Sequence, residues 1–161
     1  MANISKIKAE DGKKAPDFHL PGDAGPAVQL SKLKGRSVVV YFYPKDDTSG
    51  CTAEAKDFSC LADQFAKVGA EIIGISPDSV NSHQKFKAKY ELGLTLLADE
   101  DKKAANDYGV WVEKSMYGKK YMGIERSTFL IGKDGKIAKS WRKVKVPGHA
   151  DDVLAAVKAL K

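Results

Sequence analysis

Apolar residues recur with two different periods along the first half of the chain, and the two periods alternate. The unbroken apolar run 38–43 and the isoleucine-rich segment 70–76 predict two strands that are buried on both faces. Apolar spacings of three and four across 51–68 predict an amphipathic helix after the first strand. After the second strand, Pro77-Asp78 indicates a turn into a helix over 79–91. Because only short links join these elements, the two strands are expected to pair in parallel through a right-handed crossover.

The second half of the chain continues with shorter elements. A strand over 94–97 and a helix over 101–108 precede two strands, 127–131 and 136–141, which an Asp-Gly pair joins as a hairpin; a helix over 149–160 closes the chain. The order β, α, β, α, β, α, β, β, α predicts the α/β class, with a thioredoxin-like mixed sheet flanked by helices on both faces. Alternation alone leaves the strand order open.

Length and composition restrict the class of protein. A chain of 161 residues without internal repeats or a flexible linker indicates a single domain over 1–161. Its longest apolar run is far shorter than the roughly 20 residues of a membrane-spanning helix, so no membrane partner is expected. The net charge is +6, but the basic residues are scattered in pairs among acids. No nucleic-acid partner is expected, because tracking phosphates requires a continuous basic stripe.

The cysteine and histidine content bears on the compartment and on cofactors. Residues 1–10 alternate polar and apolar side chains and predict no secretory signal. With only two cysteines as well, a reducing, cytoplasmic location is expected. His19, His83 and His149 share no ligand spacing with the cysteines, so we expect no metal and read them as surface or packing residues.

Cys51 occupies the position with the clearest chemistry, at the start of a helix that follows a buried strand. Free amide hydrogens and the partial positive charge of a helix N-terminus favour a thiolate there. This dipole supplies about 0.3 to 1 kcal/mol, whereas lowering a thiol pKa from about 8.5 to about 6 takes roughly 3.4 kcal/mol. A fixed cation is therefore expected as well. Arg126, just before the strand 127–131, could converge on this helix at the mouth of the sheet.

The residues around Cys51 resemble a known family. Pro44, Thr48 and Cys51 match the peroxiredoxin signature Pro-x3-Thr/Ser-x2-Cys. The chain also resembles the Q-type branch, the bacterioferritin comigratory proteins, in the order and spacing of six segments, 42–52, 74–79, 96–101, 108–111, 123–131 and 134–137. The resemblance implies a thiol peroxidase of thioredoxin fold that reduces hydrogen peroxide and organic hydroperoxides without a metal, haem or flavin.

The resemblance also implies a role for each site residue. Cys51 would be the peroxidatic nucleophile, the Thr48 hydroxyl would bond the thiolate and the peroxide, and Pro44 would shield the pocket from water. Arg126 would stabilise the thiolate and the leaving oxygen, and Glu54 would orient Arg126 through a carboxylate fork. From the residues alone, plainer readings stay open: Thr48 as a helix cap, Pro44 as a strand end, Arg126 as a surface charge and Glu54 as a solvent-facing residue.

The chain departs from the Q-type pattern at the second cysteine. The branch usually carries it five residues after the first, where this chain has Lys56, and a variant group carries it in the region 82–89, where this chain has none. Cys60 faces the opposite side of the predicted helix, so we expect it to be buried packing and not a resolving residue. A bond between Cys51 and Cys60 of two chains stays open.

These departures predict a one-cysteine cycle. An external thiol such as a thioredoxin, a glutaredoxin or a small thiol would reduce the sulfenic acid, and the enzyme would be a monomer or weak dimer. Two other functions remain as alternatives. One is a thioredoxin-like disulfide exchange protein, which is disfavoured because the chain has no Cys-x-x-Cys pair. The other is a noncatalytic binding module on the same fold.

Overall fold

The computed structural model describes residues 9–33 and 35–160. The sequence predicts no secretory signal in residues 1–10, and most of this segment lies outside the described residues. The strands are β1 (His19–Leu20), β2 (Val28–Gln29), β3 (Ser37–Phe42), β4 (Ala70–Ser76), β5 (Thr95–Ala98), β6 (Trp111–Met116), β7 (Lys119–Ile124), β8 (Ser127–Ile131) and β9 (Ile137–Arg142). The helices are α1 (Ser49–Cys60), α2 (Ala62–Lys67), α3 (Val80–Tyr90), α4 (Lys103–Asp107) and α5 (His149–Ala159), with a 3-10 turn η2 (Leu30–Leu33).

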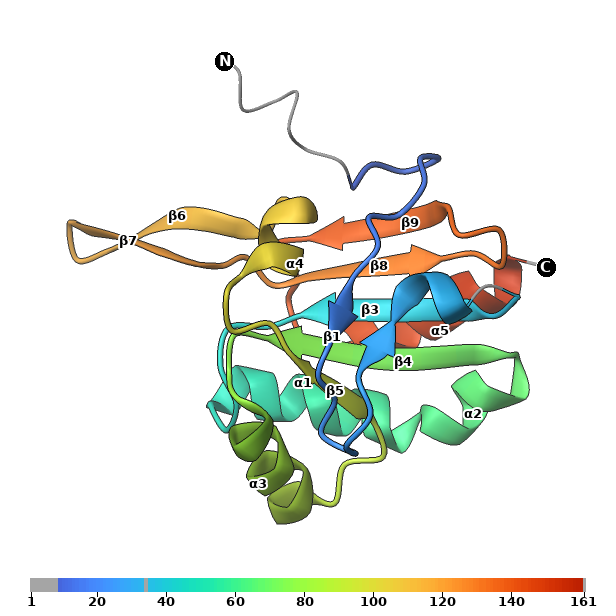
Figure 1. The fold of residues 1–161 in the computed structure, drawn as a ribbon, viewed down its shortest axis with the longest axis horizontal. Coiled ribbons are helices and arrows are strands. Elements are labelled where there is room, and N and C mark those ends of the chain that lie inside the picture. Colours follow the sequence, from blue (N-terminus) through green and yellow to red (C-terminus); the bar gives the residue numbers. More distant parts are fainter. Residues whose placement is uncertain (1–8, 34, 161) are drawn as a thin grey trace.

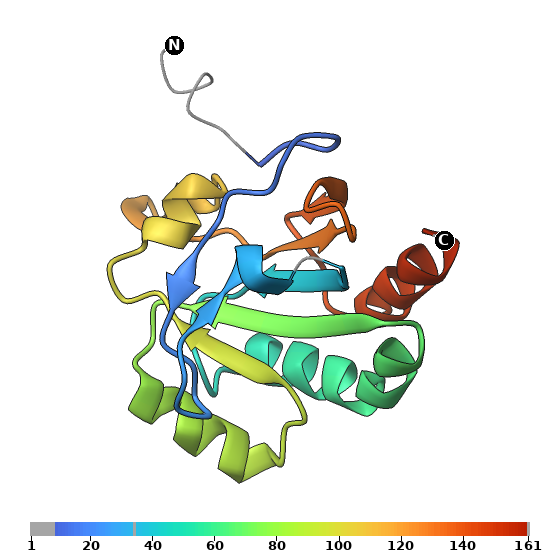
Figure 2. The same cartoon turned by 45° about the vertical axis from the view of Figure 1, so that its right-hand side comes forward.

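Five strands form one mixed sheet in the order β5-β4-β3-β8-β9 (Figures 1 and 2). β3 lies at the centre, parallel to β4 and antiparallel to β8. The parallel pairs β3–β4 and β4–β5 are joined by helical crossovers, as the alternating pattern predicts. The antiparallel β8–β9 hairpin completes the other side of the sheet. The prediction of a mixed sheet of thioredoxin-like type is confirmed.

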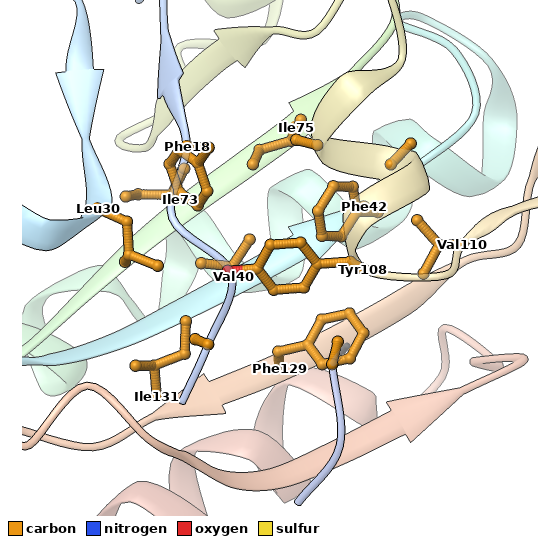
Figure 3. Close-up of a cluster of buried hydrophobic side chains, with 14 of the residues drawn as sticks. Phe18, Leu30, Val40, Phe42, Ile73, Ile75, Tyr108, Val110, Phe129 and Ile131 are labelled. Carbon is orange, nitrogen blue, oxygen red and sulfur yellow. The ribbon is translucent and has the colours of Figure 1, made fainter. Parts of the chain in front are cut away.

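Alternate residues of β3 enter two separate cores, because successive side chains of a strand point to opposite faces of the sheet. Val38, Val40 and Phe42 join the core beneath α4 and η2, which Figure 3 shows. In that core the ring of Tyr108 lies 5.1 Å from that of Phe42. Tyr41 joins the opposite core, which receives side chains from α1, α2, α3 and α5. Helices therefore cover both faces of the sheet, as predicted.

One expectation about the elements is wrong, and two pairs of strands are missing from the predicted elements. The helix predicted over 51–68 is interrupted at Leu61, whose ψ of 2° lies outside the helical range, so α1 and α2 are separate helices. The β6–β7 hairpin, which Figure 1 shows projecting from the body, is not among the predicted elements. Most of its side chains are exposed or half-buried, and polar and apolar residues mix on both faces, so no alternating pattern marks the two strands. The second omission is the β1–β2 pair, whose strands are too short to show any period.

His149, the first residue of α5, is a buried histidine in the core that contains Cys51. Its Nε2 lies 2.8 Å from Thr128 Oγ1, and its ring packs edge-on against Phe58 and Trp141. Burial lowers the pKa of His149 to about 4; Asp152 opposes this effect and Arg126 adds to it. The folded state therefore binds a proton less readily than the unfolded chain. The stability that His149 contributes is present above about pH 6.5 and is lost as the pH falls toward 4.

This linkage predicts a measurable effect of a substitution. Between pH 7.5 and pH 5, His149 should account for about 2 kcal/mol of the loss in the free energy of unfolding. In His149→Gln, which retains a hydrogen-bonding group, the loss should be smaller by about that amount, as measured by urea denaturation at both pH values. His19→Gln changes an exposed histidine and serves as the control. Equal pH dependence in all three proteins would show that His149 titrates normally.

Candidate active site

Cys51 lies in the first turn of α1, directly beyond the carboxyl end of the central strand. Thr48 occupies the N-cap position, and its carbonyl accepts the first helical hydrogen bond, from the Thr52 amide, at 2.8 Å. The amides of Ser49, Gly50 and Cys51 are therefore the free donors of the helix N-terminus. The Cys51 side chain is only 2% exposed. The free amides and the helix N-terminus thus place partial positive charge next to a buried sulfur.

Arg126 approaches the sulfur from the neighbouring strand. Its Nη2 donates a hydrogen bond to Cys51 Sγ at 3.4 Å. The strand register explains this position: β8 runs antiparallel to β3 and Ser127 pairs with Phe42, so the residue before β8 lies at the carboxyl end of β3. Gly50 leaves the room that the guanidinium needs, since a Cβ there would lie 3.1 Å from Arg126 Nη2. The fold thus brings the predicted cation to the predicted nucleophile.

Glu54, one helical turn after Cys51, holds Arg126 from the other side. Its Oε1 accepts a hydrogen bond from Arg126 Nη1 at 2.6 Å, and the residue is 1% exposed, so it does not face solvent. Glu54 Oε2 has no partner among the described residues, which means that a single bond replaces the expected carboxylate fork. Burial raises the pKa of Glu54 to about 7, although Arg126 opposes the rise.

The charge of Arg126 is favoured by its two neighbours. Burial alone would lower the pKa of Arg126, but Glu54 and Cys51 outweigh this effect and raise it. The Arg126 side chain is only 17% exposed, so it is not a free surface charge. Cys51, Arg126 and Glu54 therefore form one hydrogen-bonded chain in which a fixed cation lies against the sulfur.

Thr48 and Pro44 lie beside this chain without joining it. The Thr48 hydroxyl donates to the Lys45 carbonyl at 2.9 Å, so it makes neither the expected bond to Cys51 nor a side-chain cap on α1. Pro44 is half-buried and follows Tyr43 at the end of β3. Both residues belong to the loop that leads from the sheet to the helix of Cys51.

A buried ion pair fixes this loop, and the sequence reasoning missed it. Asp46 accepts hydrogen bonds from the Tyr43 hydroxyl at 2.6 Å and from His83 Nδ1 at 2.8 Å. His83 Nε2 faces the Leu97 carbonyl at 2.9 Å. Because both ring nitrogens face acceptors, the geometry favours a ring that carries hydrogen on both nitrogens and is charged. Burial alone would lower the pKa of His83, but Asp46 and the Leu97 carbonyl raise it. The spacing of His83 relative to the other histidines and cysteines contained no sign of this contact.

Cys60 differs from expectation. It is exposed at the last residue of α1, not buried in packing, and both cysteines are free. Nine helical residues separate it from Cys51, which corresponds to about 13.5 Å along the axis, whereas the Cα atoms of a disulfide lie within about 7 Å. An internal bond between the two is therefore excluded while α1 is intact.

The described residues also bear on two other classes of site. No group of three or more His, Cys, Asp or Glu side chains within 9–33 and 35–160 is placed to hold a metal ion. In the same residues, no helix has the length and apolar character needed to cross a membrane.

Comparisons with known proteins give consistent matches. The model of the AhpC/TSA family matches residues 12–140. The chain is 53% identical over 149 residues to peroxiredoxin Bcp of Bacillus subtilis, which covers 92% of this chain and 95% of that protein. It is 43% identical to peroxiredoxin Bcp of Escherichia coli, over 94% of this chain and 96% of that protein.

Solved structures agree with the sequence matches. Peroxiredoxin Q of Xanthomonas campestris superposes with a TM-score of 0.85 at 48% identity, over 89% of this chain and 90% of that one. A structure of the bacterioferritin comigratory protein of the same organism, described in connection with alkyl peroxide reduction and a trapped intermediate or ligand complex, has the same TM-score of 0.85 and 48% identity. It covers 88% of this chain and 90% of that chain.

Proposed function

This chain belongs to the AhpC/TSA family, and among its members to the Bcp peroxiredoxins, and we propose that it is a thiol peroxidase whose nucleophile is Cys51. The predicted membership in the Q-type branch is confirmed. Hydrogen peroxide and organic hydroperoxides, alkyl hydroperoxides among them, are the proposed substrates. The observation that carries the assignment is the hydrogen bond from Arg126 to the buried sulfur at the helix N-terminus.

The proposed reaction starts from the Cys51 thiolate. The sulfur attacks one peroxide oxygen, an S–O bond forms as the O–O bond breaks, and the leaving oxygen takes up a proton to become water or an alcohol. The product on the protein is a sulfenic acid. Arg126, fixed by Glu54, stabilises the thiolate and the negative charge that develops on the leaving oxygen, without reorganising during the step.

Thr48 and Pro44 complete the proposed site. Rotation of the Thr48 hydroxyl away from the Lys45 carbonyl would let it donate to the thiolate or to a bound peroxide. Pro44 has no amide hydrogen and lies half-buried before the α1 helix, where it would exclude water from the sulfur. Both roles rest on the position of these residues in the loop before Cys51.

An external thiol would complete the cycle. Lys56 stands where the Q-type branch usually has its second cysteine, and Cys60 lies at the far end of α1. We therefore propose a one-cysteine cycle, with a thioredoxin, a glutaredoxin or a small thiol as reductant and no cofactor. Residues 1–161 are proposed to act as one catalytic domain, in the cytoplasm, as a monomer or weak dimer.

Mass analysis without reducing agents tests this cycle. Reduced protein is mixed with one equivalent of hydrogen peroxide, and a gain of one oxygen atom at Cys51 is expected within the mixing time. Cys60→Ser should give the same first oxidation at the same rate, because Cys60 is distant from the reacting sulfur. A disulfide in the product, or a large loss of rate on changing Cys60, would contradict the one-cysteine cycle. Oxidation no faster than that of a free thiol would contradict the peroxidase itself and favour disulfide exchange or a noncatalytic binding module.

A further inference from the structure

Large apolar side chains that are exposed concentrate on one projecting element. Four of the five such residues in the described part of the chain lie on the β6–β7 hairpin, namely Met116, Tyr117, Tyr121 and Met122. Figure 1 shows this hairpin extending beyond the body at the edge where β3 ends and α1 begins, which is the edge that holds Cys51. We call β6, β7 and their turn the arm. An exposed apolar cluster of this kind is typical of an interaction surface.

The strand register divides the arm into two faces. Lys114 pairs with Tyr121 and Met116 with Lys119, and side chains that lie directly opposite in an antiparallel pair share a face. We call these four residues the basic face of the arm. The other face carries the pairs 113 with 122 and 115 with 120.

The two faces differ in charge. On the second face, Lys120 Nζ lies 3.6 Å from Glu113 Oε2, so its charges compensate each other. Neither lysine of the basic face has a salt-bridge partner among the described residues. The basic face therefore combines two uncompensated positive charges with the exposed side chains of Met116 and Tyr121.

The basic face begins beside the active site. The Lys114 side chain lies over Gly123, toward the base of the arm, where a Cβ on the glycine would meet Lys114 Cδ at 3.3 Å. Burial lowers the pKa of Lys114; Arg126 adds to this effect, and Glu125 and Cys51 oppose it. The base of the arm leads directly into the active site, because β7 ends at Ile124, two residues before Arg126.

The tip of the arm carries an exposed aromatic residue at an unfavourable backbone position. Tyr117 has a φ of 52° and Gly118 a φ of 78°, as in a two-residue type I′ turn, for which Asn-Gly is preferred. A tyrosine in this region costs on the order of 1 kcal/mol. Its side chain is 98% exposed and gains nothing from packing within the chain. Tyrosine is enriched at protein interfaces, which fits a contact made with another molecule.

We propose that the basic face of the arm binds an acidic protein dithiol and guides its reactive cysteine to oxidised Cys51. This inference rests on the proposed function, because it concerns the reductant of the same sulfur. Charge complementarity selects the occupant: the two lysines on the basic face, which have no salt-bridge partner among the described residues, favour a negatively charged partner. A second copy of the chain, whose net charge is also +6, would bring positive charge against positive charge.

The redox step balances with a dithiol reductant. One thiolate of the partner attacks the sulfur of the Cys51 sulfenic acid; an S–S bond forms, the S–O bond breaks, and hydroxide leaves and is protonated to water. The second thiol of the partner then attacks the mixed disulfide. The Cys51 thiolate is released, and the partner leaves with an internal disulfide. The partner has thus been oxidised by the two electrons that reduced the sulfenic acid.

Charge reversal on adjacent residues of the arm tests the proposal. Lys119→Glu and Lys120→Glu change the net charge equally but lie on opposite faces. With an acidic thioredoxin as reductant and peroxide in excess, Lys119→Glu should lower kcat/KM for thioredoxin by roughly five- to tenfold, and Lys120→Glu by less than about twofold. Tyr121→Ser should lower it as well. Raising the salt concentration from about 0.05 to about 0.5 M should reduce the difference between the two lysine variants.

Two measurements separate this surface from the peroxidase activity. The first oxidation by peroxide, followed by stopped flow, and turnover with dithiothreitol should be unchanged in every arm variant. If wild-type protein is oxidised rapidly but Lys119→Glu and Lys120→Glu have the same kcat/KM for thioredoxin, the proposal for the arm is wrong and the proposed function stands. If wild-type protein is not oxidised rapidly, the proposed function fails, and the arm proposal with it.

Two other occupants of the arm would also overturn the proposal. A dimer in sedimentation experiments that dissociates in Tyr121→Ser would assign the arm to a second copy of the chain. Sedimentation with vesicles of anionic phospholipid that Lys119→Glu abolishes would assign it to a lipid surface. Wild-type protein that remains monomeric and unbound to vesicles, while showing the thioredoxin effects above, supports the acidic dithiol.

Discussion

Cys51→Ser is expected to lower peroxide turnover by at least roughly a thousandfold, because a serine hydroxyl stays protonated at neutral pH and is a poor nucleophile toward a peroxide oxygen. Cys51 is 2% exposed and a serine fits its volume, so the fold should persist. The measurement is peroxide consumption with dithiothreitol as reductant, together with circular dichroism of the variant.

Cys60→Ser is the matched control for this experiment. It removes the other free thiol, which is exposed at the end of α1 and distant from Arg126. Full turnover in Cys60→Ser with none in Cys51→Ser is the expected pair of results. Peroxide consumption that survives in Cys51→Ser would place the chemistry on another residue.

Arg126→Ala is expected to slow the first oxidation by roughly a hundredfold, since it removes the cation that lies 3.4 Å from the sulfur. Arg126→Lys should recover only part of the rate, because one ammonium cannot reproduce the planar contact with both Cys51 and Glu54. The measurement is the second-order rate constant for oxidation by peroxide, obtained by stopped flow.

The loss of Arg126 also leaves Glu54 buried without its partner, which calls for a structural control. Arg126→Ala combined with Glu54→Gln removes both charges, so a loss of rate in this double variant cannot come from an unpaired carboxylate. The double variant should be as slow as Arg126→Ala while unfolding at a similar temperature to the wild type. A double variant with the wild-type rate constant would show that Arg126 acts only through the stability of the site.

The elements that the sequence predicts best are those buried on both faces or amphipathic over several turns. β3 is an apolar run, β4 is rich in buried isoleucine, and α5 keeps one apolar face, so local pattern and tertiary burial agree. In the arm, no local pattern could indicate burial, because both of its faces are largely exposed to solvent. The break at Leu61 depends on how α1 and α2 pack on the sheet. The local spacing of apolar residues does not reveal this packing.

The features of the candidate site also differ in how far the sequence predicts them. The approach of Arg126 to Cys51 follows from topology, because β8 starts where β3 ends. The sequence predicts that Arg126 could reach the mouth of the sheet, but not that β8 is the neighbour of β3. The sequence does not predict the orientations of single side chains. The Thr48 hydroxyl turns to the Lys45 carbonyl, and Cys60 turns outward at the end of a helix shorter than expected. The Asp46–His83 pair joins residues 37 positions apart, which spacing does not reveal.

The rate of Cys51 alkylation as a function of pH tests the central claim most directly. With iodoacetamide and the Cys60→Ser protein, only one thiol reacts. A free thiol loses reactivity by roughly 80-fold between pH 8 and pH 6, because its thiolate is protonated. We expect the rate at Cys51 to fall by less than about threefold over that range, since Arg126 and the helix N-terminus place positive charge beside the sulfur. A pH profile that matches glutathione would contradict the account.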